Sequence, residues 1–408
     1  MEIALAWCLA WGDKREPQFG LSVLQQMREA LNNGAEAPDE VKAIVEQVRQ
    51  LQSIDDDYFP PTLDELKNKY PDLWNQETKI GLVYGGATKI KGYVFEASKL
   101  PDIRGASALL DRINLVDLPA FFGQDKEDSR YDQQCENARI WLDKYSAKDT
   151  DNLKLSDALI SELIIYSTGG NILAFCPSAY VNDLANAIER RYTEETLTAN
   201  SCAVGENFRL LEIRFGLLQN QIENTPWLDW YKKKHEEPIV QAYFKDKEVQ
   251  DLREQFKNRK SFNELAGKLA SQFNVRRSGN ESLELNRPSR RYPPIFETNP
   301  YLKRDEGDRR SAILNVTELP GEPWFSEALA RKRLMGQISK EDNEQQWYAK
   351  TELEWQPGRV ESWVSKFERF LLREAERRRK YYAGLSGTKQ AKSLTEIGNA
   401  SNGFVAYI

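Results

Sequence analysis

The sequence predicts an α+β protein: a small helical N-terminal module, then a βαββαβ unit, then a helical extension that ends in a strand. Three observations support this fold class. Before residue 78, apolar residues recur at the three- and four-residue spacing of amphipathic helices. Between residues 79 and 216, short runs of β-formers alternate with amphipathic segments. After residue 216, a helical period returns in a strongly charged sequence.

The composition indicates a folded chain. It has 408 residues, of which 40% are hydrophobic, enough for two or three domains with a sizeable core. No run of about 18 apolar residues predicts a membrane span. The opening segment, MEIALAWCLAWGDK, lacks a basic n-region and a small-residue cleavage site, so we expect a buried first helix rather than a signal peptide.

The cysteine and histidine content argues against several kinds of site. Four scattered cysteines without a C-x-x-C pair predict a reduced, cytoplasmic protein without disulfides. His235 is the only histidine and lies in the charged run KKKHEE, so neither zinc nor a Ser-His-Asp triad is expected. The net charge of −6 argues against binding of nucleic acid over the whole surface, but local basic patches could still bind it.

Residues 1–78 are predicted to form the helical module. Its first helix is the buried opening segment. Further helices are expected at residues 21–31, 41–51 and 63–70, where apolar positions share one face.

Residues 79–216 carry the pattern of the βαββαβ unit, with helices expected over one face of its sheet. A strand at 80–84 is followed by a glycine turn, a short run of β-formers at 93–95 and a helix at 103–113. After a polar insertion at 123–151, the expected elements are strands at 163–167 and 172–175, a helix at 181–196 and a closing strand at 208–215.

This order of strands and helices predicts a ferredoxin-like palm, the unit found in nucleotide cyclases and polymerases. Two-metal nucleotidyl transfer needs carboxylates on the first strand and on the hairpin. Here the first strand offers Gly85 and Gly86, and the hairpin offers Asn171. We therefore expect this palm to perform no catalysis by itself.

The candidate nucleotide-binding residues lie at the hairpin and on the preceding helix. Gly169, Gly170 and Asn171 allow a close approach of the backbone to a nucleotide, although a plain tight turn explains the glycines as well. Ser107 has a hydroxyl that suits the same nucleotide, and it is equally suited to close helix packing.

Residues 217–398 are expected to form a helical linker, with an amphipathic helix at 359–382. A Pro- and Arg-rich loop interrupts the linker. Its Arg287, Arg290 and Arg291 suit contact with RNA phosphates, and a plain surface loop is the alternative. The apolar run near the end of the chain, within 399–408, predicts the first strand of a second palm.

Several ordered motifs resemble one family. The run VYGGATKIKGYVFEASKLPDIRGASALLDRI is similar to the first palm of the large subunit of type III CRISPR effector complexes, and YSTGGN is similar to its Gly-Gly hairpin. The closing GFVAYI resembles the opening strand of the second palm in the Cmr-type branch. The resemblance covers most of residues 79–216 and the last dozen residues.

The resemblance implies a subunit of an RNA-guided antiviral ribonucleoprotein that contacts other effector subunits, guide RNA and target RNA. It also implies ATP as a ligand, with Mg²⁺ only where a second palm is present, whether in the same chain or as a separate polypeptide. Family members often carry an N-terminal His-Asp nuclease domain, whereas residues 11–14 (Trp-Gly-Asp-Lys) hold no histidine. A cysteine zinc finger usually follows the first palm, whereas residues 217–350 hold no cysteine.

The function expected from these observations is a scaffold that supplies half of a nucleotide-binding site. Two alternatives stay open at this point. One is a self-contained nucleotide-binding or cyclase-like enzyme, and the other is a pure protein-interaction subunit. Binding of ATP separates these two alternatives, and co-purification of small RNA favours the ribonucleoprotein.

Overall fold

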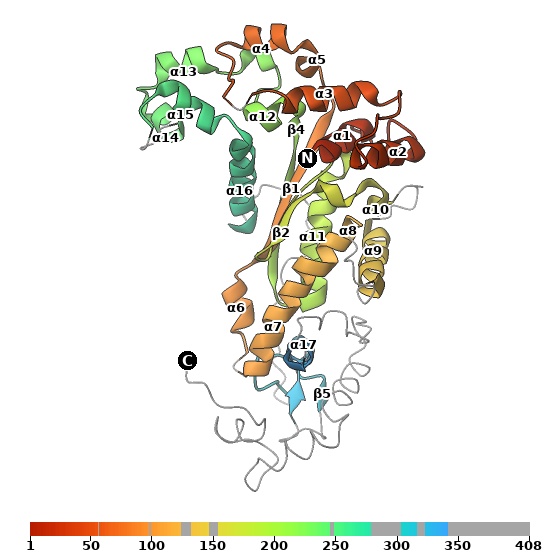
Figure 1. Cartoon of the computed structure of the whole chain (residues 1–408). Helices are drawn as coiled ribbons and strands as arrows, with labels where there is room; N and C mark the ends of the chain where they lie inside the picture. The colour runs from red at the N-terminus through yellow and green to blue at the C-terminus, as the bar shows by residue number, and fades with distance from the viewer. Residues whose placement is uncertain are drawn as a thin grey trace.

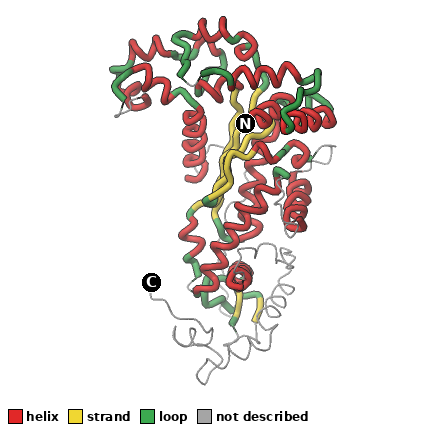
Figure 2. Tube along the Cα trace, in the orientation of Figure 1, coloured by secondary structure: helices red, strands yellow, loops and turns green. Residues whose placement is uncertain are grey.

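A narrow, twisted four-stranded sheet runs through the centre of the computed structural model, between a helical cap at one end and a smaller group of helices at the other (Figure 1). Figure 2 shows these strands in yellow. The structure describes residues 1–55, 57–97, 99–123, 132–146, 154–244, 249–278, 303–315 and 323–341. Within these ranges the protein is an α+β protein, as predicted.

All neighbouring strands of the sheet are antiparallel, in the order β2-β3-β1-β4. The strands are β1 (Lys79–Thr88), β2 (Ile164–Thr168), β3 (Asn171–Pro177) and β4 (Asn200–Arg209). The central strand, β1, pairs with both β3 and β4. Helices separate β1 from β2 and β3 from β4, so the chain follows the predicted β-α-β-β-α-β order.

The first strand is longer than predicted and contains its glycines. Gly85 and Gly86 do not form a turn; they are paired residues inside β1, where Gly86 faces Asn171 across one edge and Cys202 across the other. A Cβ on Gly85 would lie 2.5 Å from the Cβ of Ala203. Crowding by the two neighbouring strands therefore accounts for both glycines.

The predicted β-formers at residues 93–95 lie instead in and just after a short helix, α6 (Ile90–Val94). Lys89 takes a left-handed conformation with φ 51°, which turns the chain out of the sheet. Among the strands that the structure describes, none pairs with this part of the chain beyond Thr88. Without a neighbouring strand the β-propensity of the segment has no effect.

The prediction of a closing strand at residues 208–215 is wrong. The strand β4 covers Asn200–Arg209, and residues 210–215 form the helix α12 (Leu210–Phe215). The Glu212 carboxylate accepts hydrogen bonds from the backbone N–H of Arg209 (2.6 Å) and of Leu218 (2.7 Å), which ties the start of α12 to its exit.

Helices cover both faces of the sheet, not one as predicted. On one face lies α11 (Val181–Thr196), whose Val181 fills the space that Gly81 and Gly205 leave open. On the other face lies α16 (Phe262–Ser278), where the rings of Phe273 and Tyr84 are 5.0 Å apart.

The N-terminal helices appear where the periodicity predicts them. The structure has α1 (Glu2–Trp11), α2 (Leu21–Asn32), α3 (Lys42–Gln52), α4 (Leu63–Lys69) and α5 (Pro71–Trp74). Residues 4–11 of α1 are all buried, which confirms the buried first helix. Trp7 Nε1 donates to the Ala158 carbonyl at 3.0 Å. The α1 helix therefore belongs to the core that also holds the sheet.

The helix α7 (Leu100–Arg112) confirms the predicted helix at 103–113 and continues through a π-helical turn (Ile113–Asp117) into α8 (Leu118–Phe121). Buried charges hold this turn. Asp117 lies 2.8 Å from Arg191 and 3.6 Å from Arg112, and Glu195 completes the network. Burial by itself would raise the pKa of Asp117, but the two guanidinium groups outweigh it and lower that pKa.

The region after the sheet is mostly helical where the structure describes it, as predicted. Its helices, together with two that precede β2, are α9 (Asp132–Ser146), α10 (Leu155–Ala158), α13 (Leu228–Lys234), α14 (Pro238–Phe244), α15 (Leu252–Arg259) and α17 (Glu327–Glu341). The region also holds an antiparallel pair of short strands that the sequence did not predict, β5 (Leu314–Asn315) and β6 (Trp324–Phe325). The helix α17 crosses α7 at the other end of the sheet from the helical cap (Figure 1).

Three predicted features lie outside the described residues. These are the loop with Arg287, Arg290 and Arg291, the amphipathic helix at 359–382 and the terminal strand within 399–408. The domain boundaries at 78, 216 and 398 stay predictions. In the described part of the chain, no helix is both long and apolar enough to cross a membrane.

Candidate nucleotide-binding site at the hairpin

The Gly-Gly hairpin forms as predicted. Gly169 and Gly170 link β2 to β3 with φ values of 63° and 85°. Two successive positive φ angles are typical of the tight two-residue hairpin turn that favours glycine. The turn is held against β1, because the Ala87 N–H donates to the Gly170 carbonyl at 3.0 Å.

The helix α11 and the π-helical turn hold the hairpin from the face of the sheet that α11 covers. The Tyr192 hydroxyl of α11 lies 3.3 Å from the Gly170 carbonyl oxygen and 3.3 Å from Asn114 Oδ1. Ser167 Oγ donates to the Asn114 carbonyl at 2.6 Å. Because these contacts come from both α11 and the π-helical turn, the backbone of the hairpin is fixed before any ligand arrives.

The strand register places three polar side chains on the face of the sheet opposite α11. Tyr166, Thr168 and Asn171 share the face of the sheet that α16 covers at its other end. Thr168 is exposed, Asn171 is half-buried and Tyr166 is 39% exposed. Partial burial raises the pKa of the Tyr166 phenol, and the nearby Tyr84 adds to this, so the phenol is a hydrogen-bond donor at neutral pH.

Ser107 is not joined to the hairpin. It is exposed on α7, and no hydrogen bond links its side chain to Gly169, Gly170 or Asn171. Asp111 lies one turn further along α7. Burial raises the pKa of Tyr192, whose hydroxyl lies against the hairpin, and the charges of Asp117 and Asp111 add to this. Burial raises the pKa of Asp111. The structure thus brings together the three hairpin residues of the prediction and leaves Ser107 apart.

Sequence reasoning missed Tyr192 and Tyr166. For Tyr166 a signal was present, because alternation along a strand places it on the same face as Thr168. Tyr192 gave no signal, because its place beside the hairpin depends on how α11 packs against the sheet.

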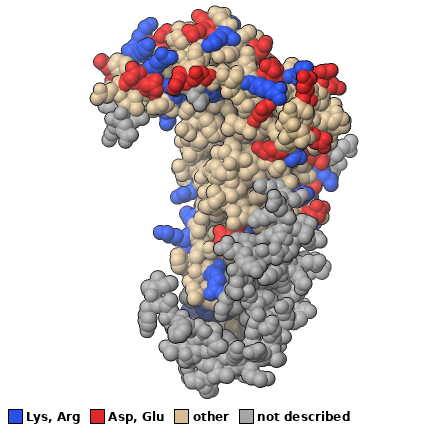
Figure 3. Space-filling model, in the orientation of Figure 1, with Lys and Arg blue, Asp and Glu red and all other residues tan. Residues whose placement is uncertain are grey.

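A basic and apolar surface adjoins the hairpin. Lys89, Lys91 and Lys99 are exposed around α6, as are Phe95 and Leu100, at 67% and 66%. Figure 3 shows basic side chains along this edge of the molecule. Cations beside an exposed aromatic ring suit contact with phosphates and stacking on bases.

The chemistry available at the hairpin is that of binding. It offers backbone groups of the turn, the Asn171 amide, the Thr168 hydroxyl and the Tyr166 phenol, which together can recognise a base or a ribose. Among the described residues, no three His, Cys, Asp or Glu side chains gather as a metal-binding group.

No family model matches the chain, and no curated protein matches it.

Proposed function

We propose that this chain is a scaffold subunit of a type III CRISPR RNA-guided antiviral ribonucleoprotein, and that its hairpin supplies half of a nucleotide-binding site. The observation that carries the proposal is the sheet itself. A β2-β3-β1-β4 antiparallel order with β-α-β-β-α-β connectivity is the arrangement expected of a ferredoxin-like palm. Two of the three motifs that resemble the CRISPR family lie on this unit, on β1, on α7 and at the hairpin.

The nucleotide half-site rests on the exposed hairpin. Its polar face is open at Tyr166 and Thr168, and lysines around α6 provide positive charge next to it. A single face of this kind contacts one side of a nucleotide. We therefore propose that a second palm, in this protein or in a separate polypeptide, completes the site.

Two measurements test the proposal. The first is purification of the full chain together with its native partners, in which small RNA and other effector subunits should co-purify. The second is calorimetric titration of ATP into the full chain, which should show weak binding without Mg²⁺-dependent turnover. Asn171→Ala should weaken this binding, whereas Asn33→Ala, at the exposed end of α2 and outside the hairpin, should leave it unchanged.

The opposite results separate the alternatives. Robust turnover of ATP by the chain alone would favour a self-contained enzyme. Absence of both RNA and ATP binding would favour a pure protein-interaction subunit, and the ribonucleoprotein proposal would then be abandoned.

A further inference from the structure

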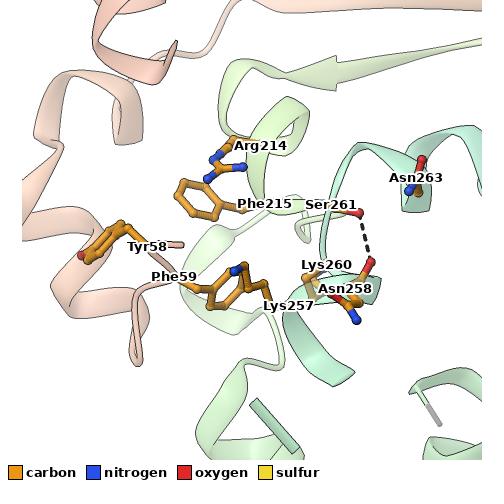
Figure 4. Close-up of a pocket in the computed structure, with 9 residues that line it drawn as sticks. All are labelled: Tyr58, Phe59, Arg214, Phe215, Lys257, Asn258, Lys260, Ser261 and Asn263. Atoms are coloured by element: carbon orange, nitrogen blue, oxygen red, sulfur yellow. Dashed lines mark hydrogen bonds between the residues drawn. The ribbon is translucent and has the colours of Figure 1, made fainter. Parts of the chain in front are cut away.

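A cavity of about 290 Å³ lies at the other end of β1 from the hairpin. It is enclosed by the segment before α4, by the end of α12 and by the junction between α15 and α16 (Figure 4). Phe59 and Phe215 form an apolar part of the wall, and both are buried. Ligand pockets usually measure about 300–1,000 Å³, so this cavity has room for a small ligand.

The charged residues that line the cavity are all basic: Arg214, Lys257 and Lys260. Lys257 Nζ is 3.2 Å from Asp57 Oδ1, but the Asp57 side chain is 96% exposed. An ion pair with so exposed a partner contributes little stability, so Lys257 can turn towards an anion at small cost. Arg214 Nη2 donates to the Asp55 carbonyl at 2.7 Å, which holds the guanidinium at the rim.

Lys260 is the buried cation of the cavity. Its side chain is 5% exposed, and its Nζ lies 3.0 Å from Glu264 Oε2. Burial lowers the pKa of Lys260, even though Glu264 and Glu212 act in the opposite direction. Lys260 Nζ also donates to the Leu217 carbonyl, and an anion in the cavity would add a further partner that stabilises the ammonium form.

Neutral hydrogen-bond donors complete the lining. Ser261 immediately precedes α16, and Asn263 lies in the first turn of that helix. The first-turn N–H groups of a helix have no partner within the helix, and the helix dipole adds positive potential there. Asn258 contributes a further side-chain amide, and its backbone carbonyl accepts a hydrogen bond from Ser261 Oγ at 3.1 Å.

We propose that this cavity binds a phosphate monoester, carried either by a free mononucleotide or by the 5′ end of an RNA strand. Arg214, Lys257 and Lys260 would neutralise the phosphate, and the amides with the helix start would donate to its oxygens. The apolar wall at Phe59 and Phe215 would contact the sugar or base. This site lies at the opposite end of the sheet from the hairpin and does not depend on the function proposed there.

Calorimetric titration of the full chain tests the proposal with four probes: AMP, adenosine, and a short oligoribonucleotide with either a 5′ phosphate or a 5′ hydroxyl. At least one of the phosphorylated probes should bind, and both the adenosine and the 5′-hydroxyl oligomer should bind at least about tenfold more weakly. Preference for AMP would identify a free nucleotide, and preference for the phosphorylated oligomer would identify an RNA end.

Three variants locate the binding. Lys257→Gln should weaken it about tenfold, by loss of a charge-assisted contact. Asn263→Asp should weaken binding of the phosphorylated probe, because the new carboxylate repels the phosphate. An acidic residue in the first turn of α16 is favourable for the helix, so the fold should stay stable. Lys268→Gln is the matched control, because this lysine also lies on α16 and pairs with Glu206 away from the cavity.

Two results would overturn the proposal. One is equal binding of phosphorylated and unphosphorylated probes, or no binding of either. The other is phosphate-dependent binding whose affinity is the same in Lys257→Gln, in Asn263→Asp and in the control Lys268→Gln. That result would place the ligand elsewhere on the chain.

Discussion

Gly86 and Glu96 are each surrounded by residues that lie far away in the sequence. A Cβ on Gly86 would collide with the Gly170 carbonyl and with Asn171, so the strand and the hairpin can meet only at a glycine. Glu96, just after α6, forms ion pairs with Arg310 and with Lys332 of α17. In both cases a single residue joins two distant segments.

Gly86→Ala is expected to destabilise the protein by about 1–3 kcal/mol, because the added methyl group overpacks a junction made of backbone atoms. The matched control is Gly92→Ala, since a Cβ on Gly92 would meet no atom within 4 Å. Urea denaturation measures both variants. Equal stabilities would show that the hairpin can move away from β1 at no cost.

Glu96 leads to a pH prediction. Burial by itself would raise its pKa, but Arg310 and Lys332 outweigh burial and lower it. A carboxyl whose pKa is lower in the folded state stabilises the protein above its unfolded pKa, about 4.3, and loses that contribution as the pH falls through the folded value. The difference in unfolding free energy between wild type and Glu96→Gln should therefore be largest near pH 7 and shrink below pH 4. A difference independent of pH would contradict the ion pairs.

At the scale of elements, the crossing of α7 and α17 shows how a segment from the linker region joins the sheet domain. Gly105 of α7 and Gly336 of α17 face each other so closely that a Cβ on either would collide with backbone of the other helix. Asp102 and Arg333 pair across the same crossing. The charges select the partner helix, and the glycines allow its close approach.

Gly105→Ala should displace α17 from α7. Hydrogen exchange should then rise in residues 327–336 while β1 keeps its protection, because the collision is local to the crossing. Gly267→Ala on α16 is the control; a Cβ there meets no atom within 4 Å, so a gain of about 0.5–1 kcal/mol is expected. Unchanged exchange in α17 would argue against the close crossing.

At the scale of the whole molecule, one aromatic cluster joins three regions of the chain. Phe59 comes from the N-terminal region, Phe215 from α12, and Trp227 and Phe256 from the helices after the sheet. Phe59 and Trp227 stack at 5.1 Å, and Trp227 Nε1 donates to the Pro60 carbonyl at 2.8 Å. The regions predicted as separate units therefore share a core, which also forms the back of the proposed phosphate cavity.

Trp227→Ala should cost about 3–5 kcal/mol, because it removes a large buried side chain at the junction. Its neighbour Trp230 is 39% exposed, so Trp230→Ala should cost much less. Thermal and urea denaturation compare the two. A small effect of Trp227→Ala would mean that the N-terminal region and the later helices are held together by other contacts.

The amino-acid sequence by itself determined the local elements of this protein. The helices α2, α3, α4 and α11 follow from apolar spacing, and the hairpin follows from two glycines between runs of β-formers, because these signals act within a few residues. Only the tertiary structure decided the rest. Apart from Val204, residues 200–207 of β4 are small or polar and are poor β-formers, yet they pair along β1, where Gly205 leaves room for Val181 of α11. In the same way Tyr192 reaches the hairpin only through the packing of α11, since contacts between distant segments leave no periodic signal in the sequence.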